Sequence, residues 1–352
     1  MSDIKLQHIT KSFKQVPALD DISFEIKDNE FFVLLGPTGA GKTTTLRIIA
    51  GLEKPDSGQV VMDGAVVNDL QPADRDIAFV FQQYSLYPTM SVYDNLAFPL
   101  RSPIRKTPED IIKQRVTKAA ELLRINHLLE RKTARLSGGE MQRVSIGRAI
   151  VREPRVFLMD EPLSNLDAKL RESLRVELKH IQKTQHSTTL FVTHDQIEAL
   201  TMADRIGVLR QGKLIQVGTP IDIYDRPATT FVAQLVGTPR INLQKASHAD
   251  STVRVENSAL AFKSPSAALP AAFTLGIRPE DVKVSSTGAQ TGKVVLIEPL
   301  GVESVVHIQT GDTQLTSIQP GITPLRLNDE VKFDVDLERL HCFDANGSRI
   351  TI

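Results

Sequence analysis

Two kinds of hydrophobic pattern alternate along the first 237 residues of the chain. Some segments are apolar throughout, which is typical of strands buried on both faces of a sheet, and others repeat apolar residues at helical spacing. The predicted strands and hairpins lie within residues 4–27, 31–35, 59–67, 77–81, 155–162, 188–195 and 205–218. The predicted helices lie at 46–51, 92–127 (interrupted by Pro99, Pro103 and Pro108), 141–151, 170–184 and 197–203. This alternation predicts an α/β fold whose parallel sheet binds ligands at the carboxyl ends of its strands.

The pattern changes near residue 237, where helical spacing disappears. Short β-like runs bounded by Gly, Pro, Asn and Ser follow at 252–256, 273–278, 292–298, 304–311, 330–336 and 348–352. We therefore expect two domains, 1–237 and 238–352, the second all-β and built as a sandwich or small barrel.

Composition is that of a globular protein, with 352 residues, 41% hydrophobic and 24% charged. Lys plus Arg and Asp plus Glu both number 42, so no global basic field favours nucleic acid as a partner. The single cysteine, Cys342, excludes an internal disulfide. The first residues lack the apolar core of a signal peptide, and no apolar run approaches the length of a membrane span. Work at a membrane would therefore require a partner.

A glycine-rich loop, GPTGAGKT at 36–43, connects the apolar run 31–35 to the next helix and fits G-x-x-x-x-G-K-[ST] without a gap. Its glycines allow backbone N–H groups to point inward around phosphate oxygens, and the helix start adds partial positive charge. Lys42 is expected to reach the β- and γ-phosphates, and the Thr43 hydroxyl to bind Mg²⁺. An ordinary glycine-rich turn is the alternative. The residues predicted to hold the nucleotide here are Gly36, Pro37, Thr38, Gly39, Ala40, Gly41, Lys42, Thr43 and Thr44.

Polar residues end three other predicted strands. Asp160 and Glu161 follow VFLM; the Asp is expected to complete the Mg²⁺ shell and the Glu to polarise the attacking water. Gln82 ends IAFVF and could reach the metal or the water, although a polar loop residue is the simpler interpretation. His194 ends TTLFVTH and could hydrogen-bond charge developing at the γ-phosphate, although a single histidine in this position is usually structural.

Ser137, Gly138 and Gly139 precede another helix, with Glu140 completing its cap. A serine and two glycines at a helix start form a second anion site, although a single nucleotide needs only one. Phe13 is either a half-buried aromatic of an edge strand or a platform on which a purine stacks.

LSGGEMQRVSIGRA at 136–149 resembles the signature sequence of ABC-type ATPases, and GPTGAGKT and VFLMDEP resemble their Walker A and Walker B motifs. The resemblance covers residues 1 to about 240 and keeps the family's order of motifs. It assigns Phe13 to the A-loop, Gln82 to the Q-loop, 164–167 with Asp167 to the D-loop, and His194 to the switch position. Glu140 departs from the usual signature glutamine, and is not expected to touch the γ-phosphate. Phe13 stands where Tyr or Trp is frequent, and stacking should survive.

The resemblance implies an ATPase that uses ATP and Mg²⁺ in a head-to-tail pair of chains. Ser137 and Gly139 of one chain would bind the γ-phosphate held by Lys42 of the other, so a monomer would bind ATP and hydrolyse it poorly. The implied catalytic residues are Glu161, His194, Gln82 and Lys42; the metal ligands are Thr43, Gln82 and Asp160. Phe13, Gly138, Asp160, Asp167 and His194 would join the loop residues around the nucleotide.

Residues 79–100 are similar to the segment after the Q-loop in importers of sugars and related solutes, and 276–282, 294–312 and 338–347 resemble the OB-like (TOBE) extension of maltose-type importer ATPases. These likenesses imply a homodimer, peripheral on the cytoplasmic face of a bacterial inner membrane, with a helical subdomain at about 88–154. Two permeases would dock near Gln82 to Pro88, and a periplasmic protein would deliver the solute.

Several alternatives stay open. The solute could be a polyamine, a phosphoglycerol or a sulfonate instead of a sugar. A soluble ABC ATPase is less favoured, because the chain has no long coiled coil or zinc site between its motifs. It also has one nucleotide domain, whereas members that act in translation usually have two. In a third interpretation the β domain is a sensor and ATP is only structural.

Overall fold

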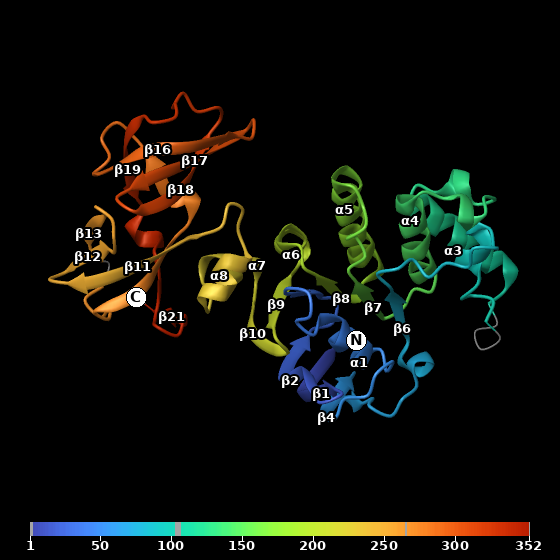
Figure 1. Cartoon of the computed structure of the whole chain (residues 1–352). Coiled ribbons are helices and arrows are strands. Elements are labelled where there is room, and N and C mark those ends of the chain that lie inside the picture. Colours follow the sequence, from blue (N-terminus) through green and yellow to red (C-terminus); the bar gives the residue numbers. More distant parts are fainter. Residues whose placement is uncertain (1–2, 103–106, 265, 352) are drawn as a thin grey trace. The chain divides into compact units, whose positions relative to one another are not determined.

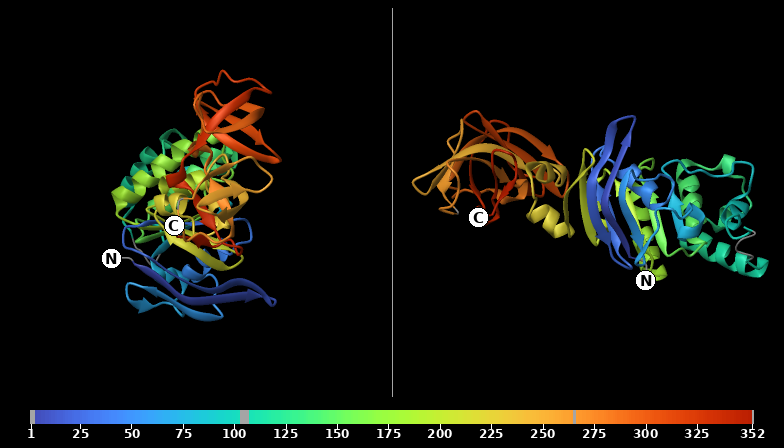
Figure 2. Two further views of the ribbon diagram at one scale, coloured as in Figure 1. Left: turned by 90° about the vertical axis from the view of Figure 1, so that its left-hand side faces the viewer. Right: turned by 90° about the horizontal axis from the view of Figure 1, so that it is seen from below.

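The structure, a computed structural model, describes residues 3–102, 107–264 and 266–351. Contacts between residues divide the chain into two compact units, Met1–Pro220 and Ile221–Ile352. Each unit is described by itself (Figure 1, Figure 2). Among the described residues, no helix is both long and apolar enough to cross a membrane.

A six-stranded sheet forms the centre of the first unit, in the order β10-β9-β3-β8-β7-β6. Its strands are β3 (Phe31–Leu35), β6 (Ile77–Val80), β7 (Val156–Asp160), β8 (Thr188–Thr193), β9 (Arg205–Arg210) and β10 (Lys213–Gly218). Neighbours from β9 to β6 run parallel, and the edge strand β10 is antiparallel. Every residue of β3, β7 and β8 is buried, which confirms the prediction of a parallel sheet covered on both faces.

An antiparallel sheet, β2-β1-β4-β5, packs with helix α1 (Lys42–Ile49) against the parallel sheet. Its strands are β1 (Ile4–Phe13), β2 (Val16–Ile26), β4 (Ser57–Met62) and β5 (Ala65–Val66). Leu6 and Phe24 of this sheet, Leu46 of α1 and Leu34 of β3 belong to one hydrophobic core. The rings of Phe24 and Phe32 stack at 5.2 Å between centroids. Because α1 packs against side chains of both sheets, this core fixes the position of α1 and of the loop before it.

Three helices of the first unit, α2 (Val92–Ala97), α3 (Glu109–Leu122) and α4 (Gly138–Ile150), contact one another. A Cβ atom on Gly147 would lie 2.8 Å from Leu96 Cδ2, so glycine is needed where α4 meets α2. Pro99 and Pro108 lie between α2 and α3; Pro103 lies outside the described residues. The remaining helices follow β7 and β8 as α5 (Ala168–Gln185) and α6 (Gln196–Met202). Short 3-10 turns are η1 (Pro72–Arg75), η2 (Asn126–Leu128) and η3 (Thr133–Arg135).

The second unit contains two antiparallel sheets, β13-β12-β11-β14-β20-β21 and β15-β19-β16-β17-β18. Its strands are β11 (Asn242–Ala249), β12 (Thr252–Val255), β13 (Ala261–Lys263), β14 (Ala272–Ile277), β15 (Val282–Val284), β16 (Gln290–Pro299), β17 (Glu303–Thr310), β18 (Thr313–Pro320), β19 (Glu330–Val335), β20 (His341–Phe343) and β21 (Arg349–Ile350), with turns η4 (Pro279–Asp281) and η5 (Leu337–Arg339). Both sheets contribute to one core, which contains Leu275 and Phe333. The predicted all-β domain is confirmed as a barrel-like pair of sheets.

Six of these strands coincide with the predicted runs; β11, β13, β15, β18 and β20 were not predicted. The last predicted run includes Ile352, which lies outside the described residues. Cys342 lies in β20 and is 1% exposed, and burial raises the pKa of its thiol to about 11.

The division between the units falls after Pro220, the first residue of α7 (Pro220–Asp225), and so places α8 (Thr230–Leu235) and the rest of α7 in the second unit, whereas the sequence predicts a boundary at 237. Arg278 explains the difference. Its guanidinium donates to the backbone carbonyls of Tyr224 (2.8 Å), Ala233 (3.1 Å) and Val236 (2.6 Å), and it lies 4.0 Å from the centre of the Tyr224 ring. Two helices that precede the β domain in sequence are thereby bonded to it.

Candidate functional site

The carboxyl ends of β3, β7 and β8 lie side by side in the parallel sheet. Leu35, the last residue of β3, pairs with Thr193 of β8, and Val192 pairs with Asp160 of β7. The glycine-rich loop, Glu161 and His194 are the next residues along these three strands. Sheet pairing therefore brings the loop close to two groups that follow it by more than a hundred residues in the sequence.

The loop curls around the side chain of its own lysine. Lys42 is 5% exposed, and its Nζ donates to the backbone carbonyls of Gly36 (2.9 Å) and Pro37 (3.1 Å). Gly41 has φ +106°, and a Cβ there would lie 2.5 Å from the carbonyl oxygen of Ala18. Burial lowers the pKa of Lys42, and the nearby Glu161 carboxylate opposes that shift.

Glu161 links the lysine to the histidine. Its Oε1 lies 3.5 Å from Lys42 Nζ, and its Oε2 lies 3.0 Å from His194 Nδ1. The residue has φ +45°, in the left-handed region, and its N–H donates to the carbonyl of Val192 at 3.0 Å. This turn directs the carboxylate toward the loop. The side chain is 15% exposed, so it can meet a water molecule at the mouth of the site.

Asp160, the residue before Glu161, contacts Thr43 of the loop. Thr43 Oγ1 donates to Asp160 Oδ1 at 3.0 Å. Asp160 is 6% exposed, and burial raises the pKa of its carboxyl. A hydroxyl and a buried carboxylate are hard oxygen donors of the kind that Mg²⁺ takes, so these residues fit that ion.

A cavity of about 280 Å³ opens beside these groups. It is lined by Ala18, Thr38, Gly39, Gly41, Lys42, Thr43, Thr44, Gln82 and Glu161. Eight of the nine lining residues were predicted from the sequence. Ala18 was not, because an alanine in a strand carries no chemical signal of its own.

The other predicted nucleotide ligands are not among the residues that line this cavity in the described chain. Phe13 ends β1 and is 45% exposed. Asp167 caps α5, where its carboxylate accepts from Leu170 N–H at 3.0 Å. Ser137, Gly138 and Gly139 begin α4.

The start of α4 has the cap that the sequence predicts, but the cap also engages the serine hydroxyl, which sequence reasoning missed. Ser137 N–H and Oγ both donate to Glu140 Oε2, at 2.7 and 2.9 Å. The pattern S-x-x-E in the sequence signals such a capping box, but it does not show that the hydroxyl is engaged. Tyr84 lies near the same helix start, since a Cβ on Gly138 would be 3.1 Å from its hydroxyl.

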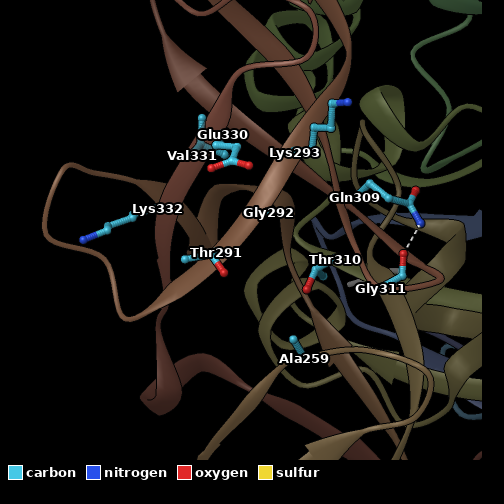
Figure 3. Close-up of a pocket in the computed structure, with 10 residues that line it drawn as sticks. All are labelled: Ala259, Thr291, Gly292, Lys293, Gln309, Thr310, Gly311, Glu330, Val331 and Lys332. Carbon is cyan, nitrogen blue, oxygen red and sulfur yellow. Dashed lines mark hydrogen bonds between the residues drawn. The ribbon is translucent and has the colours of Figure 1, made fainter.

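A larger hollow, of about 510 Å³, lies in the second unit (Figure 3). Thr291, Gly292 and Lys293 of β16 and Glu330, Val331 and Lys332 of β19 form much of its wall. Gln309 Nε2 donates to the carbonyl of Gly311 at its rim. Its lysines are exposed, and the strands and turns that line it carry no G-x-x-x-x-G-K-[ST] loop, so its lining does not indicate a nucleotide site.

Comparison with known proteins identifies the first unit and the β domain separately. The profile of the ABC transporter family matches residues 19–164, and that of the TOBE domain matches 275–343. A glycerol-3-phosphate import ATP-binding protein of Agrobacterium fabrum is 46% identical over 99% of this chain and 100% of its own length. The chain belongs to the ATP-binding proteins of ABC importers. A trehalose/maltose import ATP-binding protein of Thermococcus litoralis is 45% identical, over 99% of both chains.

Solved structures agree with this ABC assignment. An ATP-binding cassette, determined as a dimer in a post-hydrolysis state with ADP and phosphate, is 31% identical, with a TM-score of 0.56. The match covers 62% of this chain and 98% of the cassette. The predicted fold class and ATPase activity are therefore confirmed: this ABC importer subunit binds ATP and couples its hydrolysis to uptake of a solute.

Proposed function

We propose that this ABC ATPase hydrolyses ATP with Glu161 as the group that orients and polarises the attacking water. The observation that carries this proposal is the position of its carboxylate, 3.5 Å from Lys42 Nζ and 3.0 Å from His194 Nδ1. A carboxylate so placed can accept a proton from water while the two neighbouring groups stabilise charge on the transferred phosphoryl group. Gln82, at the edge of the same cavity, would help to hold that water.

Mg²⁺ would be held by Thr43, Asp160 and Gln82, and when bound it would neutralise charge on the β- and γ-phosphates. Lys42 prepares the site for those phosphates. Its ammonium group is held by two loop carbonyls and Glu161, and phosphate oxygens would replace these contacts. The loop N–H groups from Gly36 to Thr44 would complete the cradle.

The active unit in this proposal is a homodimer. Ser137, Gly138 and Gly139 begin a helix, as Lys42 does, yet they do not line the cavity of their own chain among the described residues. Facing the cavity of a second copy, they would bind its γ-phosphate, and a two-fold axis would create two such sites. Phe13 would stack on the adenine, and Asp167 would lie near the shared site.

Permeases would dock on a hollow of about 360 Å³ next to the loop from Gln82 to Pro88. Phe81, Tyr87 and Phe98 expose 37%, 38% and 45% of their surfaces there. Arg148 of α4 lies over the Tyr87 ring at 5.5 Å and donates to the carbonyl of Ser85 at 2.7 Å. A hollow of this size, with aromatic rings beside serine and arginine side chains, suits a short helix of a membrane partner, and Arg148 would transmit its movement to α4.

The solute would be a sugar or a related compound such as a glycerol phosphate, in line with the two relatives. The protein would lie on the cytoplasmic face of a bacterial inner membrane, bound to two permeases and served by a periplasmic solute-binding protein. Stimulation of ATP hydrolysis by the assembled permeases and a loaded binding protein, tested with maltose, trehalose and glycerol 3-phosphate, would separate these solutes.

Glu161→Gln tests the assignment of the water-polarising group. The amide keeps the size of the carboxylate and cannot accept the proton, so we expect hydrolysis to fall by at least about 100-fold while ATP binding persists. ATP with Mg²⁺ should then trap a stable dimer, measured by sedimentation, and phosphate release should be undetectable above background. Turnover at the wild-type rate in this variant would contradict the assignment.

A further inference from the structure

The hydroxyl of Ser137 is already committed inside its own chain. It donates to Glu140 Oε2 at 2.9 Å, and it accepts from the N–H of Glu140 at 3.4 Å. A hydroxyl has a single proton to donate. To donate to a phosphate oxygen, Ser137 must therefore release the carboxylate.

Glu140 carries its negative charge in this position. The hydrogen bond from the Ser137 backbone N–H lowers the pKa of the carboxyl, and the positive charge of Arg131 acts in the same direction. Arg131 Nη1 lies 3.7 Å from Glu140 Oε1. Arg131 is about half exposed, so it compensates the carboxylate charge in part.

A phosphate on Ser137 would lie close to this charge. An oxygen accepting from Oγ at a normal hydrogen-bond distance would be within about 6 Å of Glu140 Oε2, because that carboxylate oxygen lies 2.9 Å from Oγ and also accepts from the Ser137 backbone N–H. Carboxylate and phosphate repel each other at this distance, and the repulsion grows as closure of a dimer excludes water.

We propose that Glu140 is a positioning residue that opposes closure of the ATP-bound dimer, by holding the Ser137 hydroxyl and by repelling the γ-phosphate. The proposal rests on the dimeric site described above. Arg131 moderates the repulsion. The same carboxylate stabilises α4 as part of its capping box, so one side chain both caps the helix and weakens its anion site.

Glutamine separates the two effects. Its amide oxygen can still accept from the Ser137 N–H and complete the cap, but it carries no charge. Alanine removes both the cap and the charge. Arg131→Gln removes the compensating cation and leaves the carboxylate.

The experiment uses the full chain with Glu161→Gln as parent, so that ATP is bound and not consumed. Dimerisation with ATP and Mg²⁺ is measured by sedimentation over a range of chain concentrations. Binding of a fluorescent ATP analogue to the dilute monomer reports the phosphate loop alone. Glu140→Gln should tighten the dimer by about three- to tenfold, and Arg131→Gln should weaken it, with monomer affinity unchanged in both.

Glu121→Gln, at an exposed position of α3, is the matched control for loss of one negative charge and should leave the dimer constant unchanged. The gain from Glu140→Gln should shrink as salt is added. Thermal unfolding should show a loss for Glu140→Ala and none for Glu140→Gln. An unchanged or weaker dimer with Glu140→Gln would overturn the inference about Glu140 and leave the proposed dimeric site standing. A parent that fails to dimerise with ATP would overturn the proposed dimeric site, and the inference with it.

Discussion

At the scale of single residues, the site of the free chain is held by contacts that ATP must replace. Lys42 binds carbonyls of its own loop, Thr43 binds Asp160, and Glu161 lies between Lys42 and His194. The contacts of Lys42 and Asp160 satisfy charged groups that are almost completely buried. The groups are thus close to their places in the reaction before the nucleotide arrives, which lowers the cost of ordering them.

Asp160 shows what this arrangement costs in stability. Because burial raises the pKa of its carboxyl, the folded chain holds the proton more tightly than the unfolded chain does. The stability that protonated Asp160 contributes to the folded chain is therefore complete at low pH, and it is lost as the pH rises through the pKa of Asp160 in the folded chain. At neutral pH the ionised carboxylate destabilises the nucleotide-free protein.

Asp160→Asn should raise the melting temperature of the nucleotide-free protein at neutral pH by about 2 °C, while ATP hydrolysis is lost. The asparagine oxygen can still accept from Thr43, but it carries no charge. Calorimetry from pH 4 to pH 8 should show the difference growing with pH. Asp69→Asn, where the side chain is 96% exposed, is the control and should not change the melting temperature. A lower melting temperature for Asp160→Asn at neutral pH would contradict this explanation.

At the scale of elements, Arg278 attaches two helices to the barrel of the second unit. Its side chain is 1% exposed and donates hydrogen bonds to three backbone carbonyls, one in the last turn of α7, one in the last turn of α8 and one directly after α8. Its Nε has no hydrogen-bond partner among the described residues, so the attachment depends on the two terminal nitrogens.

Arg278→Ala should destabilise the second unit by about 3 kcal/mol, because it leaves those carbonyls buried without donors. Urea unfolding of the full chain should show an earlier transition. Limited proteolysis should cut faster between residues 221 and 240. Arg254→Ala, an exposed arginine of β12, should change neither. Equal proteolysis of Arg278→Ala and wild type would show that the helices are held by other contacts.

Elements whose physics is local could be predicted from the sequence. The strands β3, β7 and β8 each contain an unbroken apolar run, and the phosphate loop has a fixed order of residue types. In contrast, β18 (TQLTSIQP) is rich in polar residues and becomes a strand by pairing with β17. The helices α7 and α8 have six residues each, too few to show a period.

For the candidate site, the residue types could be predicted from the sequence, but the side-chain contacts could not. Residue types and their places at strand ends predicted the groups at the cavity. The distance between Glu140 and Ser137 depends on side-chain rotamers, which a sequence pattern does not determine. The departure at Glu140 was visible in the sequence, but its consequence for the hydroxyl was not.

At the scale of the whole molecule, the unit of function in our proposal is a pair of chains. Each nucleotide would be bound by Lys42 of one copy and Ser137 of the other. Two defective chains can then form one intact site together, provided that one chain is defective in its Lys42 half and the other in its Ser137 half.

Lys42→Ala and Ser137→Asp provide such a pair. Aspartate still caps α4, but places a charge where the γ-phosphate would bind. Each variant alone should hydrolyse ATP very slowly. When the two variants are combined in equal amounts, half of the dimers contain one chain of each. One of the two sites in such a dimer is intact, so about a quarter of the wild-type rate should return. Phosphate release from the mixture measures this, and no recovery would contradict a shared site.

The buried thiol of Cys342 has a practical consequence for such experiments. It is the one cysteine of the chain, it is 1% exposed, and its raised pKa keeps the reactive thiolate scarce. A spectroscopic label would therefore attach to a single cysteine introduced on the surface and leave Cys342 unmodified. A dimer of such chains would carry two identical probes, and the separation between them would follow opening and closure through the ATP cycle.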